Sequence, residues 1–318
     1  MLIAHFTDPH VTERPERISW RHLANKRLLG WANLVIGGLY GEFAGAVEIL
    51  RALVDDLMRV APDWIVSTGD LTGLSLESEF ESARVALHPL LDDLRVTGIP
   101  GNHDVYVPNA VDEKLYESAF GSWTRTDLSP GDFPEENEMR TLYPYPLVRF
   151  LGAKVVLVCL RDVRPNAIHD SSGMAGETQL RALDRLLAGE QMQNRIKIVA
   201  LHYGLCRSGG QPDSRHHGLR DAGPLIEILS RRDVALLLHG HLHERFVIRR
   251  AFGGSMTIAN PGSLASRKPH HSRAYHLLRI QSGSIELEAR RFDGEELRFI
   301  PWKDAPGTGV IWRGTGCK

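Results

Sequence analysis

The sequence is poor in cysteine, is almost neutral overall and has no long uncharged apolar run. Its three cysteines among 318 residues match neither a disulfide framework nor a metal-binding motif, which favours a reducing compartment. No apolar stretch reaches the roughly 20 residues of a transmembrane helix, and the first ten residues do not resemble a secretory signal. The formal net charge of -1 argues against a general attraction to nucleic acid, and no nucleic-acid-binding domain is visible. We therefore expect a cytoplasmic protein.

Strand-like and helix-like segments alternate along most of the chain. Short apolar runs predict strands at 2–7, 64–70, 94–100, 154–160, 196–202 and 233–241. Helical periodicity predicts helices at 45–60, 85–94, 178–188 and 222–232. Three further strands, 255–260, 274–280 and 284–292, follow without helices. This order predicts an α/β layered fold in one domain, residues 1–300, followed by a loose Gly-rich tail, residues 301–318.

Polar side chains stand at the ends of the predicted strands. These residues are Asp8 and His10, Asp70, Asn102 with His103 and Asp104, His202, and His241 with His243. In open α/β sheets the loops beyond the carboxyl ends of strands converge on the binding crevice. Carboxylate, imidazole and amide oxygen are ligands for hard or borderline metals. Each motif alone is common in surface loops, but their shared position at strand ends predicts a metal site.

The order of these motifs resembles that of the calcineurin-like metallophosphoesterase superfamily. The matching motifs are Asp8-x-His10, Gly69-Asp70, Gly101-Asn102-His103-Asp104, His202 and Gly240-His241-x-His243. The resemblance runs from residue 2 to the segment "NPGSL" at 260–264. It implies a four-layer α-β-β-α sandwich, here with a helical lid or cap inserted near the N-terminus. Pro9 and the "HYG" that begins at His202 depart from the usual pattern, which leaves the substrate class open.

The resemblance also implies a dinuclear centre holding two divalent or trivalent metal ions, Mn, Fe or Zn. One ion would be held by Asp8, His10, Asp70 and His243, and the other by Asp70, Asn102, His202 and His241. Asp70 would bridge the two ions, and a metal-bridging hydroxide would attack the phosphorus. By the same resemblance His103 would stabilise or protonate the leaving oxygen, and Asp104 would orient His103.

Other histidines and one arginine lie outside these motifs. Arg215, His216 and His217 form either an exposed loop or a substrate-binding arm, since their charge and donors suit a phosphate. His5, inside the first predicted strand, is expected to be a packed core residue, and His239 either a packed residue or one that supports the ligands without binding metal itself.

Residues 17–43 do not fit a minimal core of this kind. Basic residues alternate there with apolar ones, namely Arg17, Arg21, Lys26 and Arg27 with Trp20, Leu23, Leu28, Leu29, Trp31 and Leu34. Such a stretch suits either a helical lid over the active site or a segment that lies on a membrane surface or binds a lipid-linked substrate.

Three functional hypotheses follow from the sequence. The first is a metal-dependent phosphodiesterase for small phosphodiesters, with phosphomonoesters left open. The second is a pyrophosphatase or phosphodiesterase for a lipid-linked nucleotide-sugar substrate, with peripheral membrane contact through residues 17–43. The third is a non-catalytic scaffold, which predicts lost ligands, whereas every motif position here is filled. Metal identity and oligomeric state are left open.

Overall fold

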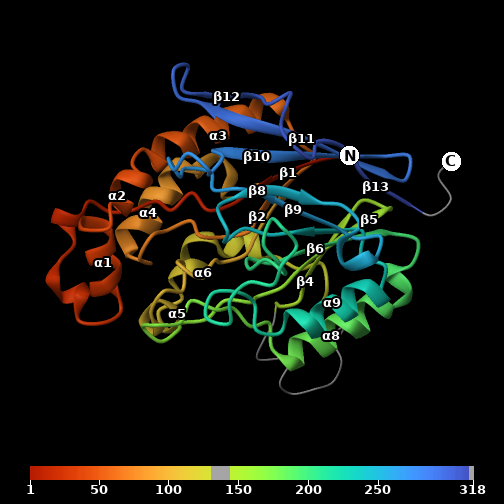
Figure 1. Cartoon of the computed structure of the whole chain (residues 1–318), viewed down its shortest axis with the longest axis horizontal. Helices are drawn as coiled ribbons and strands as arrows, with labels where there is room; N and C mark the ends of the chain where they lie inside the picture. Colours follow the sequence, from red (N-terminus) through yellow and green to blue (C-terminus); the bar gives the residue numbers. More distant parts are fainter. Residues whose placement is uncertain (130–143, 315–318) are drawn as a thin grey trace.

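Two mixed β-sheets form the centre of the molecule, with helices on their outer faces (Figure 1). The computed structural model describes residues 1–129 and 144–314. Within that part, the first sheet has the order β12-β11-β10-β1-β2-β3, with β13 pairing β11. Its strands are β1 (Leu2–Phe6), β2 (Trp64–Ser67), β3 (Val96–Gly98), β10 (Ala274–Gln281), β11 (Ser284–Asp293), β12 (Arg298–Pro301) and β13 (Gly309–Arg313).

The second sheet has the order β4-β5-β6-β7-β9-β8 in the described residues. Its strands are β4 (Leu147–Leu151), β5 (Val155–Cys159), β6 (Ile196–Ala200), β7 (Leu236–Leu238), β8 (Arg245–Ile248) and β9 (Thr257–Pro261). Strands β5, β6, β7 and β9 run parallel, as do β1, β2 and β3 in the first sheet. Their carboxyl ends therefore lie at a common edge of each sheet.

Helices cover the outer face of each sheet (Figure 1). The first sheet is covered by α3 (Ala46–Val60), α4 (Glu77–Ala86) and α6 (Leu115–Phe120), and the second by α8 (Glu177–Ala188) and α9 (Ala222–Arg231). The smaller helices are α1 (Arg27–Val35), α2 (Leu39–Glu42) and α5 (Pro108–Asp112). Single 3₁₀ turns are η1 (Pro15–Arg17), η2 (Trp20–Leu23), η3 (His88–Leu90), η4 (Gly121–Thr124), η6 (Glu190–Met192) and η7 (Ala251–Gly253).

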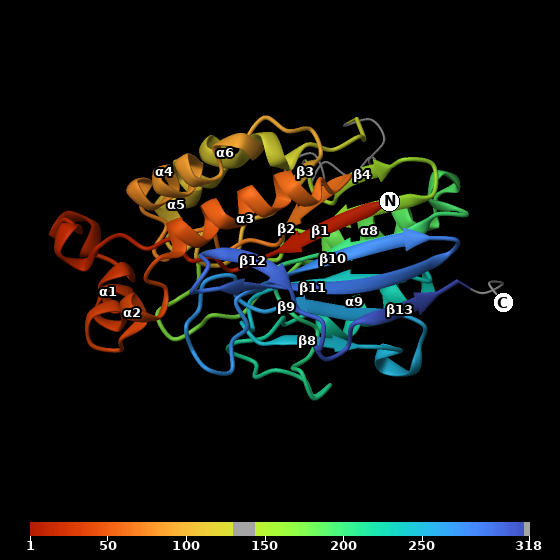
Figure 2. The same ribbon diagram turned by 90° about the horizontal axis from the view of Figure 1, so that it is seen from above.

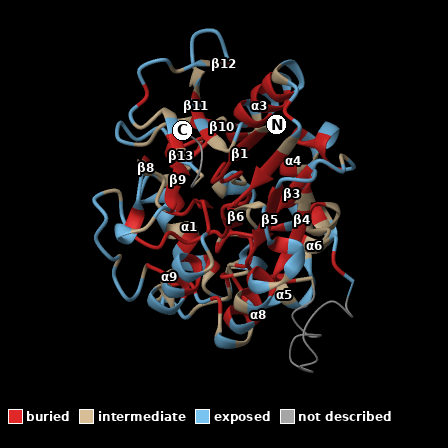
Figure 3. Cartoon of the chain, turned by 90° about the vertical axis from the view of Figure 1, so that its right-hand side faces the viewer, coloured by how far each residue is buried: buried red, intermediate tan, exposed pale blue. Residues whose placement is uncertain are grey.

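Alternation along the central strands builds the layers. In β1, Ala4 and Phe6 pack under the helices, whereas Ile3 points between the two sheets. In β5, Val156 packs under the helices of its own sheet and Leu157 points between the sheets. Successive strand residues face opposite sides, so each central strand is buried on both faces, as Figure 3 shows in red. The expected four-layer α-β-β-α sandwich is confirmed.

Two predictions about local structure were wrong. The helix expected at 85–94 lies mainly earlier, at 77–86, because Pro89 lacks an N–H and interrupts helical bonding there. The tail expected at 301–318 is not loose over 309–313, where β13 pairs with β11 and Ile311 is buried. Residues 315–318, with Cys317, lie outside the described residues.

The stretch 17–43 is helical in part, but its expected role as a lid stays a prediction. In the described ranges 1–129 and 144–314, no single helix is long and apolar enough to cross a membrane. The consecutive helical segments Arg27–Val35 and Leu39–Val60 are together long and apolar enough by length and composition alone, but the pair is bent by 72°. Ile49, Leu50 and Leu53 of the second part pack in the core of the first sheet.

Candidate metal centre

The carboxyl ends of the parallel strands bring the predicted ligands to one place. Asp8 follows β1, Asp70 follows β2 and Asn102 follows β3, so the first sheet supplies the carboxylates and the amide. The second sheet supplies imidazoles from the loops after β6 and β7. Backbone bonds join these loops, including Asp8 N–H to the Gly69 carbonyl at 3.0 Å. Backbone hydrogen bonds between the loops therefore fix the edge at which the ligand loops of the two sheets meet.

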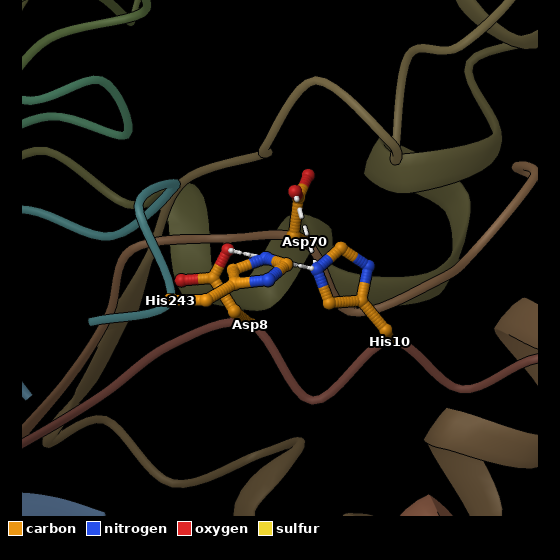
Figure 4. Close-up of side chains that lie close together, drawn as sticks. All are labelled: Asp8, His10, Asp70 and His243. Carbon is orange, nitrogen blue, oxygen red and sulfur yellow. Dashed lines mark hydrogen bonds and ion pairs between the residues drawn. The ribbon is translucent and has the colours of Figure 1, made fainter. Parts of the chain in front are cut away.

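A first group of ligand atoms consists of Asp8, His10, Asp70 and His243, which point toward one another in Figure 4. Their ligand atoms all lie within 4.8 Å of one another. The Nε2 atom of His10 lies 3.7 Å from Asp8 Oδ1 and 3.6 Å from Asp70 Oδ2. The Nε2 atom of His243 lies 3.4 Å from Asp8 Oδ1. Two imidazole nitrogens and two carboxylate oxygens around one point fit a borderline metal ion.

A second group meets around the side-chain oxygen of Asn102. This oxygen lies 2.9 Å from His202 Nε2 and 3.0 Å from His241 Nδ1. Asp70 belongs to both groups, because its Oδ2 atom lies 3.4 Å from His202 Nε2 as well as near His10. Its other oxygen accepts the backbone N–H of His103 at 2.7 Å. That bond leaves Oδ2 directed between the two groups, as a bridging ligand requires.

The backbone carries strain at the same positions. Five residues of the two groups have left-handed φ angles: Asp8 at 53°, His10 at 49°, Asp70 at 54°, His241 at 67° and His243 at 57°. The left-handed conformation costs a residue with a Cβ roughly 1–2 kcal/mol. Such strain gathers at functional sites, where the surrounding structure enforces it. The loops are therefore built to aim these side chains rather than to minimise local energy.

Two motif glycines allow the loops to approach the carboxylates. A Cβ on Gly101 would overlap the side chain and backbone of Asp70. A Cβ on Gly240 would overlap the carboxylate of Asp8 and the hydroxyl of Thr7. The backbone of Asp70 cannot move aside as the tip of a flexible side chain can, and the Asp8 carboxylate is itself a candidate ligand. Neither glycine can therefore be replaced by a larger residue without moving a candidate ligand.

The electrostatic environment keeps the carboxylates ionised. Burial pushes the pKa of Asp70 upward, but His202, His103 and His10 outweigh it and hold the pKa well below its usual value. Burial acts on Asp8 in the same way, and the nearby imidazoles again bring its pKa below the usual value. Burial lowers the pKa of His10 to about 3, despite an opposing effect of Asp70. Burial also pushes the pKa of His202 downward, but Asp70 and Asp8 outweigh it and raise the pKa to about 10, so a metal ion there would displace a proton from this imidazole.

His103 lies beside the first group rather than within it. Its ring contacts that of His10 edge-on at 4.8 Å between centroids, and it stacks on Tyr106 at 5.4 Å. Its Nδ1 atom lies 2.6 Å from the carbonyl oxygen of Gly73. The backbone carbonyl and the tyrosine ring together fix the orientation of the imidazole.

Asp104 does not have the expected role of orienting His103. Its buried carboxylate instead accepts backbone N–H groups of Gly101 at 2.9 Å, Thr72 at 2.9 Å and Leu71 at 3.2 Å. It therefore holds the turn that carries Asn102 and His103 against the loop after β2. No sequence signal identifies Gly73 as the partner of His103, because any residue can offer a carbonyl oxygen.

The loop 211–218 borders the second group. The His217 ring lies 4.3 Å from that of His241, and its carbonyl oxygen lies 3.0 Å from His241 Nε2. The Oδ2 atom of Asp213 lies 2.6 Å from Nδ1 of His217 and fixes the position of that ring. Of the three residues expected to contact substrate, His217 thus lies at the site, whereas Arg215 and His216 are exposed on the same loop. Their binding role stays a prediction.

His5 and His239 are buried, as expected for packed residues. His5 Nε2 pairs with the Thr68 hydroxyl at 3.0 Å, and His239 Nδ1 lies 3.0 Å from the Gly240 carbonyl. Burial lowers the pKa of His5 to about 3 and that of His239 to about 4. Both imidazoles are therefore neutral in the interior.

Sequence reasoning missed several residues around the site. Phe43 places its ring 4.5 Å from that of His10, and nothing in the sequence marks it apart from other core phenylalanines. Asp162 accepts the backbone N–H groups of His202 at 3.1 Å and Tyr203 at 2.8 Å. Its position just beyond the strand at 155–159 is the signal that could have found it.

A further carboxylate lies on the outer side of His243. Glu42, His243 and His271 form a second possible metal-binding set. The Glu42 carboxylate already accepts the Ser266 hydroxyl at 2.6 Å and pairs with Lys268 at 2.9 Å. Through these contacts Glu42 holds the segment after β9 next to His243.

Comparison with solved structures finds the same fold in a phosphatase. The structure of a dimetal phosphatase from Danio rerio matches with a TM-score of 0.65 and 13% identity, covering 98% of this chain and 99% of that one. The sulfate thiohydrolase SoxB from Thermus thermophilus has a TM-score of 0.47 and 17% identity, covering 94% of this chain and 56% of that one. Vacuolar protein sorting 29 from Cryptosporidium parvum has a TM-score of 0.38 and 12% identity, covering 94% of each chain. No curated protein matches the sequence significantly.

The sequence itself carries the assignment to a family. The family described as calcineurin-like phosphoesterase matches residues 1–245, which is well over half of the chain. This range includes every candidate ligand, from Asp8 to His243, and ends where the second sheet is still incomplete. The ligand groups, their strand-end positions and this match lead to one conclusion: the chain belongs to the calcineurin-like phosphoesterase family.

Proposed function

We propose that this protein is a metal-dependent phosphodiesterase with a dinuclear centre. Its family and its candidate ligand group support metal-dependent phosphoester hydrolysis. The observation that carries the dinuclear assignment is the position of Asp70, whose Oδ2 atom lies 3.6 Å from His10 Nε2 and 3.4 Å from His202 Nε2. A single carboxylate oxygen between two sets of imidazoles is what a bridged pair of ions needs.

The proposed ligand sets follow from the two groups. Asp8, His10, Asp70 and His243 would hold one ion, and Asp70, Asn102, His202 and His241 the other. Two bound ions would clamp the phosphoryl group and supply an activated water at neutral pH. The two sets contain only two carboxylates, so two ions of charge +2 or more keep the site positive toward an anionic ester. Mn, Fe and Zn all accept these ligands, and their supply decides occupancy.

His103 is the proposed acid for the leaving group. With Nδ1 held by the Gly73 carbonyl, the ring directs Nε2 away from the backbone. A protonated imidazole in this position would stabilise or protonate the oxygen that departs from phosphorus. Asp104 supports this role only indirectly, by holding the turn at Gly101 and Thr72.

The surroundings of His10 favour a diester over a monoester. His103 lies on one side of the His10 ring, and Phe43 lies on another side at 4.5 Å. Phe43 also lines a cavity of about 330 Å³, whose charged lining residues are Arg14, Arg17 and Arg51 with Glu13 and Glu48. A phosphodiester carries two substituents, and this arrangement offers one place beside the proposed acid and another beside the aromatic ring.

A second candidate function is hydrolysis of a lipid-linked nucleotide-sugar pyrophosphate or diester. It is favoured by exposed apolar residues in α1 and just after it, among them Leu28 and Ile36, close in sequence to Lys26, which lies over the Tyr106 ring. The scaffold hypothesis has less support, because the candidate ligand positions and His103 are all filled.

Paired model substrates test the proposal. Metal-stripped protein would be refilled with Mn, Fe or Zn and assayed with bis(4-nitrophenyl) phosphate and with 4-nitrophenyl phosphate. We expect metal-dependent turnover that favours the diester and that is lost in Asn102→Ala. Asn109→Ala, an exposed asparagine in α5, is the matched control. A monoester preference would overturn the diester assignment, and no turnover despite two bound ions per chain would overturn the enzyme assignment for simple esters.

A further inference from the structure

Helix α1 has two apolar sides, and only one of them packs against the body of the protein. Arg27, Gly30 and Leu34 are buried, and they lie on one face at helical spacing. The opposite side carries Leu28, Leu29, Ala32 and Val35 at the spacing of a single stripe, which the helix-capping residue Ile36 continues. A surface helix of a globular protein normally shows polar residues on that side. Here the outward side is apolar.

The outward stripe is strongly exposed. Ile36 is 84% exposed, Leu28 50%, Val35 49% and Leu29 44%, and the nearby Trp20 is 76% exposed. Single exposed apolar residues are common on protein surfaces, but a contiguous group on one helix marks an interaction site. Figure 2 shows α1 and α2 at one end of the molecule, away from both sheets.

The stripe cannot be buried by a simple shift of α1, because its inner side is fixed. The buried Arg27 guanidinium donates to the carbonyl oxygens of Leu74 at 2.9 Å and Ser75 at 2.6 Å. A Cβ on Gly30 would overlap Leu74, so the helix lies as close to this loop as its backbone permits. The Trp31 indole N–H donates to the Pro15 carbonyl at 3.2 Å.

Within residues 17–41 the formal charges have one sign, although the exposed Glu16 lies in the adjoining turn η1. Residues 17–41 contain no Asp or Glu, whereas Arg17 and Arg21 are exposed and Lys26 is half-buried. A protein partner of mixed charge would not require this excess of basic over acidic residues. An anionic membrane surface favours the excess, since exposed basic residues near apolar anchors add electrostatic attraction to hydrophobic insertion. Trp20 suits the boundary between headgroups and acyl chains.

We propose that the stripe Leu28, Leu29, Ala32, Val35 and Ile36, with Trp20 and Arg21 beside it, docks this protein on the surface of an anionic phospholipid bilayer. The inference does not rest on the proposed phosphodiesterase activity. The docking surface is nevertheless connected to the proposed active site, because Lys26 lies 4.8 Å over the Tyr106 ring, which stacks on His103. These two contacts connect the start of α1 to the proposed acid His103.

Cosedimentation with vesicles tests this proposal on the full chain. The lipids are phosphatidylcholine alone and phosphatidylcholine mixed with phosphatidylglycerol. We expect binding to the mixed vesicles that weakens with added salt, and at least about tenfold weaker binding for the double variant Leu28→Ser with Ile36→Ser. Arg21→Gln should weaken binding to mixed vesicles only. The controls Leu94→Ser, at a 63% exposed leucine, and Lys154→Gln should bind as the wild type does.

Results of two kinds would overturn the proposal. One is absence of binding to mixed vesicles by the wild type, or equal binding by the double variant. The other is a dimer that the double variant dissociates, without vesicle binding, which would assign the stripe to contact between copies of this chain. Turnover of a soluble diester by each variant, measured in parallel, separates failure of docking from failure of the proposed function.

Discussion

The Nδ1 atom of His103 lies 2.6 Å from the carbonyl oxygen of Gly73. Since a carbonyl oxygen only accepts, Nδ1 must carry a proton, and Nε2 is the ring nitrogen left for a substrate. The loop containing Gly73 is itself held on both sides, by Arg27 through carbonyl oxygens and by Glu79 through the N–H groups of Leu74 and Leu76. The position of the proposed acid thus depends on residues outside every recognised motif.

Replacing His103 by asparagine should slow hydrolysis according to the leaving group. For a diester with an alkyl alcohol we expect a loss of about 10²–10⁴-fold in kcat, because the departing alkoxide needs a proton. For a nitrophenyl diester the loss should be much smaller, since nitrophenolate departs unprotonated. Steady-state kinetics with both substrates, with metal content measured on the same samples, checks this. Equal losses for the two substrates would exclude an acid role for His103.

Asp70 should control two ions and His10 only one. Asp70→Ala removes the oxygen shared by both groups, so we expect both ions to be lost or strongly weakened. His10→Ala should leave the ion at Asn102, His202 and His241 in place. Elemental analysis of bound metal per chain measures this directly, with Asn109→Ala as control. Two tightly bound ions in Asp70→Ala would contradict the shared position.

Removing bound metal should lower the thermal stability of the folded chain. The candidate ligands come from both sheets, so bound ions would tie the sheets together and stabilise only the folded state. We expect chelation to lower the Tm and readdition of Mn or Zn to restore it. Differential scanning calorimetry checks this, and Asp70→Ala should show little response to the chelator. A chelator effect of the same size in that variant would contradict the assignment.

Arg27→Met should destabilise the protein by about 3 kcal/mol. The variant keeps much of the side-chain volume but leaves the carbonyl oxygens of Leu74 and Ser75 without their buried charged donor. Urea unfolding measures the change. The matched control is Arg59→Met, whose side chain is 55% exposed and pairs with Asp56, and its effect should stay below about 1 kcal/mol. Similar effects for both variants would show that the loop does not depend on Arg27.

Glu79 should make stability fall as the pH rises. Burial raises its pKa from 4.5 to about 7, although the N–H groups of Leu74, Glu13 and Leu76 act in the opposite direction. The folded state therefore holds a proton between pH 4.5 and 7 that the unfolded state has released. This contribution is present in full below pH 4.5 and is lost as the pH rises through 7.

Urea unfolding of the wild type and Glu79→Gln at pH 5 and pH 8 checks the Glu79 prediction. Effects of other groups cancel in the difference between the two proteins. Relative to the wild type, the variant should gain stability between these pH values, by up to about 3 kcal/mol. A constant difference would mean that Glu79 has an ordinary pKa in the folded protein.

Much of the fold follows from local patterns in the sequence. The apolar run at 155–159 and the helical spacing of Ile49, Leu50 and Leu53 depend on residues close in the chain, so both elements were predicted. The strand at 309–313 was missed because it pairs only with a distant strand, β11. A short edge strand has little pattern of its own, and its existence depends on the partner it meets.

The sequence by itself determined which ligand types are present and that they follow strands: two carboxylates, one amide and four imidazoles of the proposed centre. Only the tertiary structure decided how they are used. It placed Oδ2 of Asp70 between His10 and His202 and gave His103 the carbonyl of Gly73 rather than the carboxylate of Asp104. Side-chain types are fixed by covalent chemistry, whereas these contacts join loops far apart in the chain and exist only once both sheets have packed.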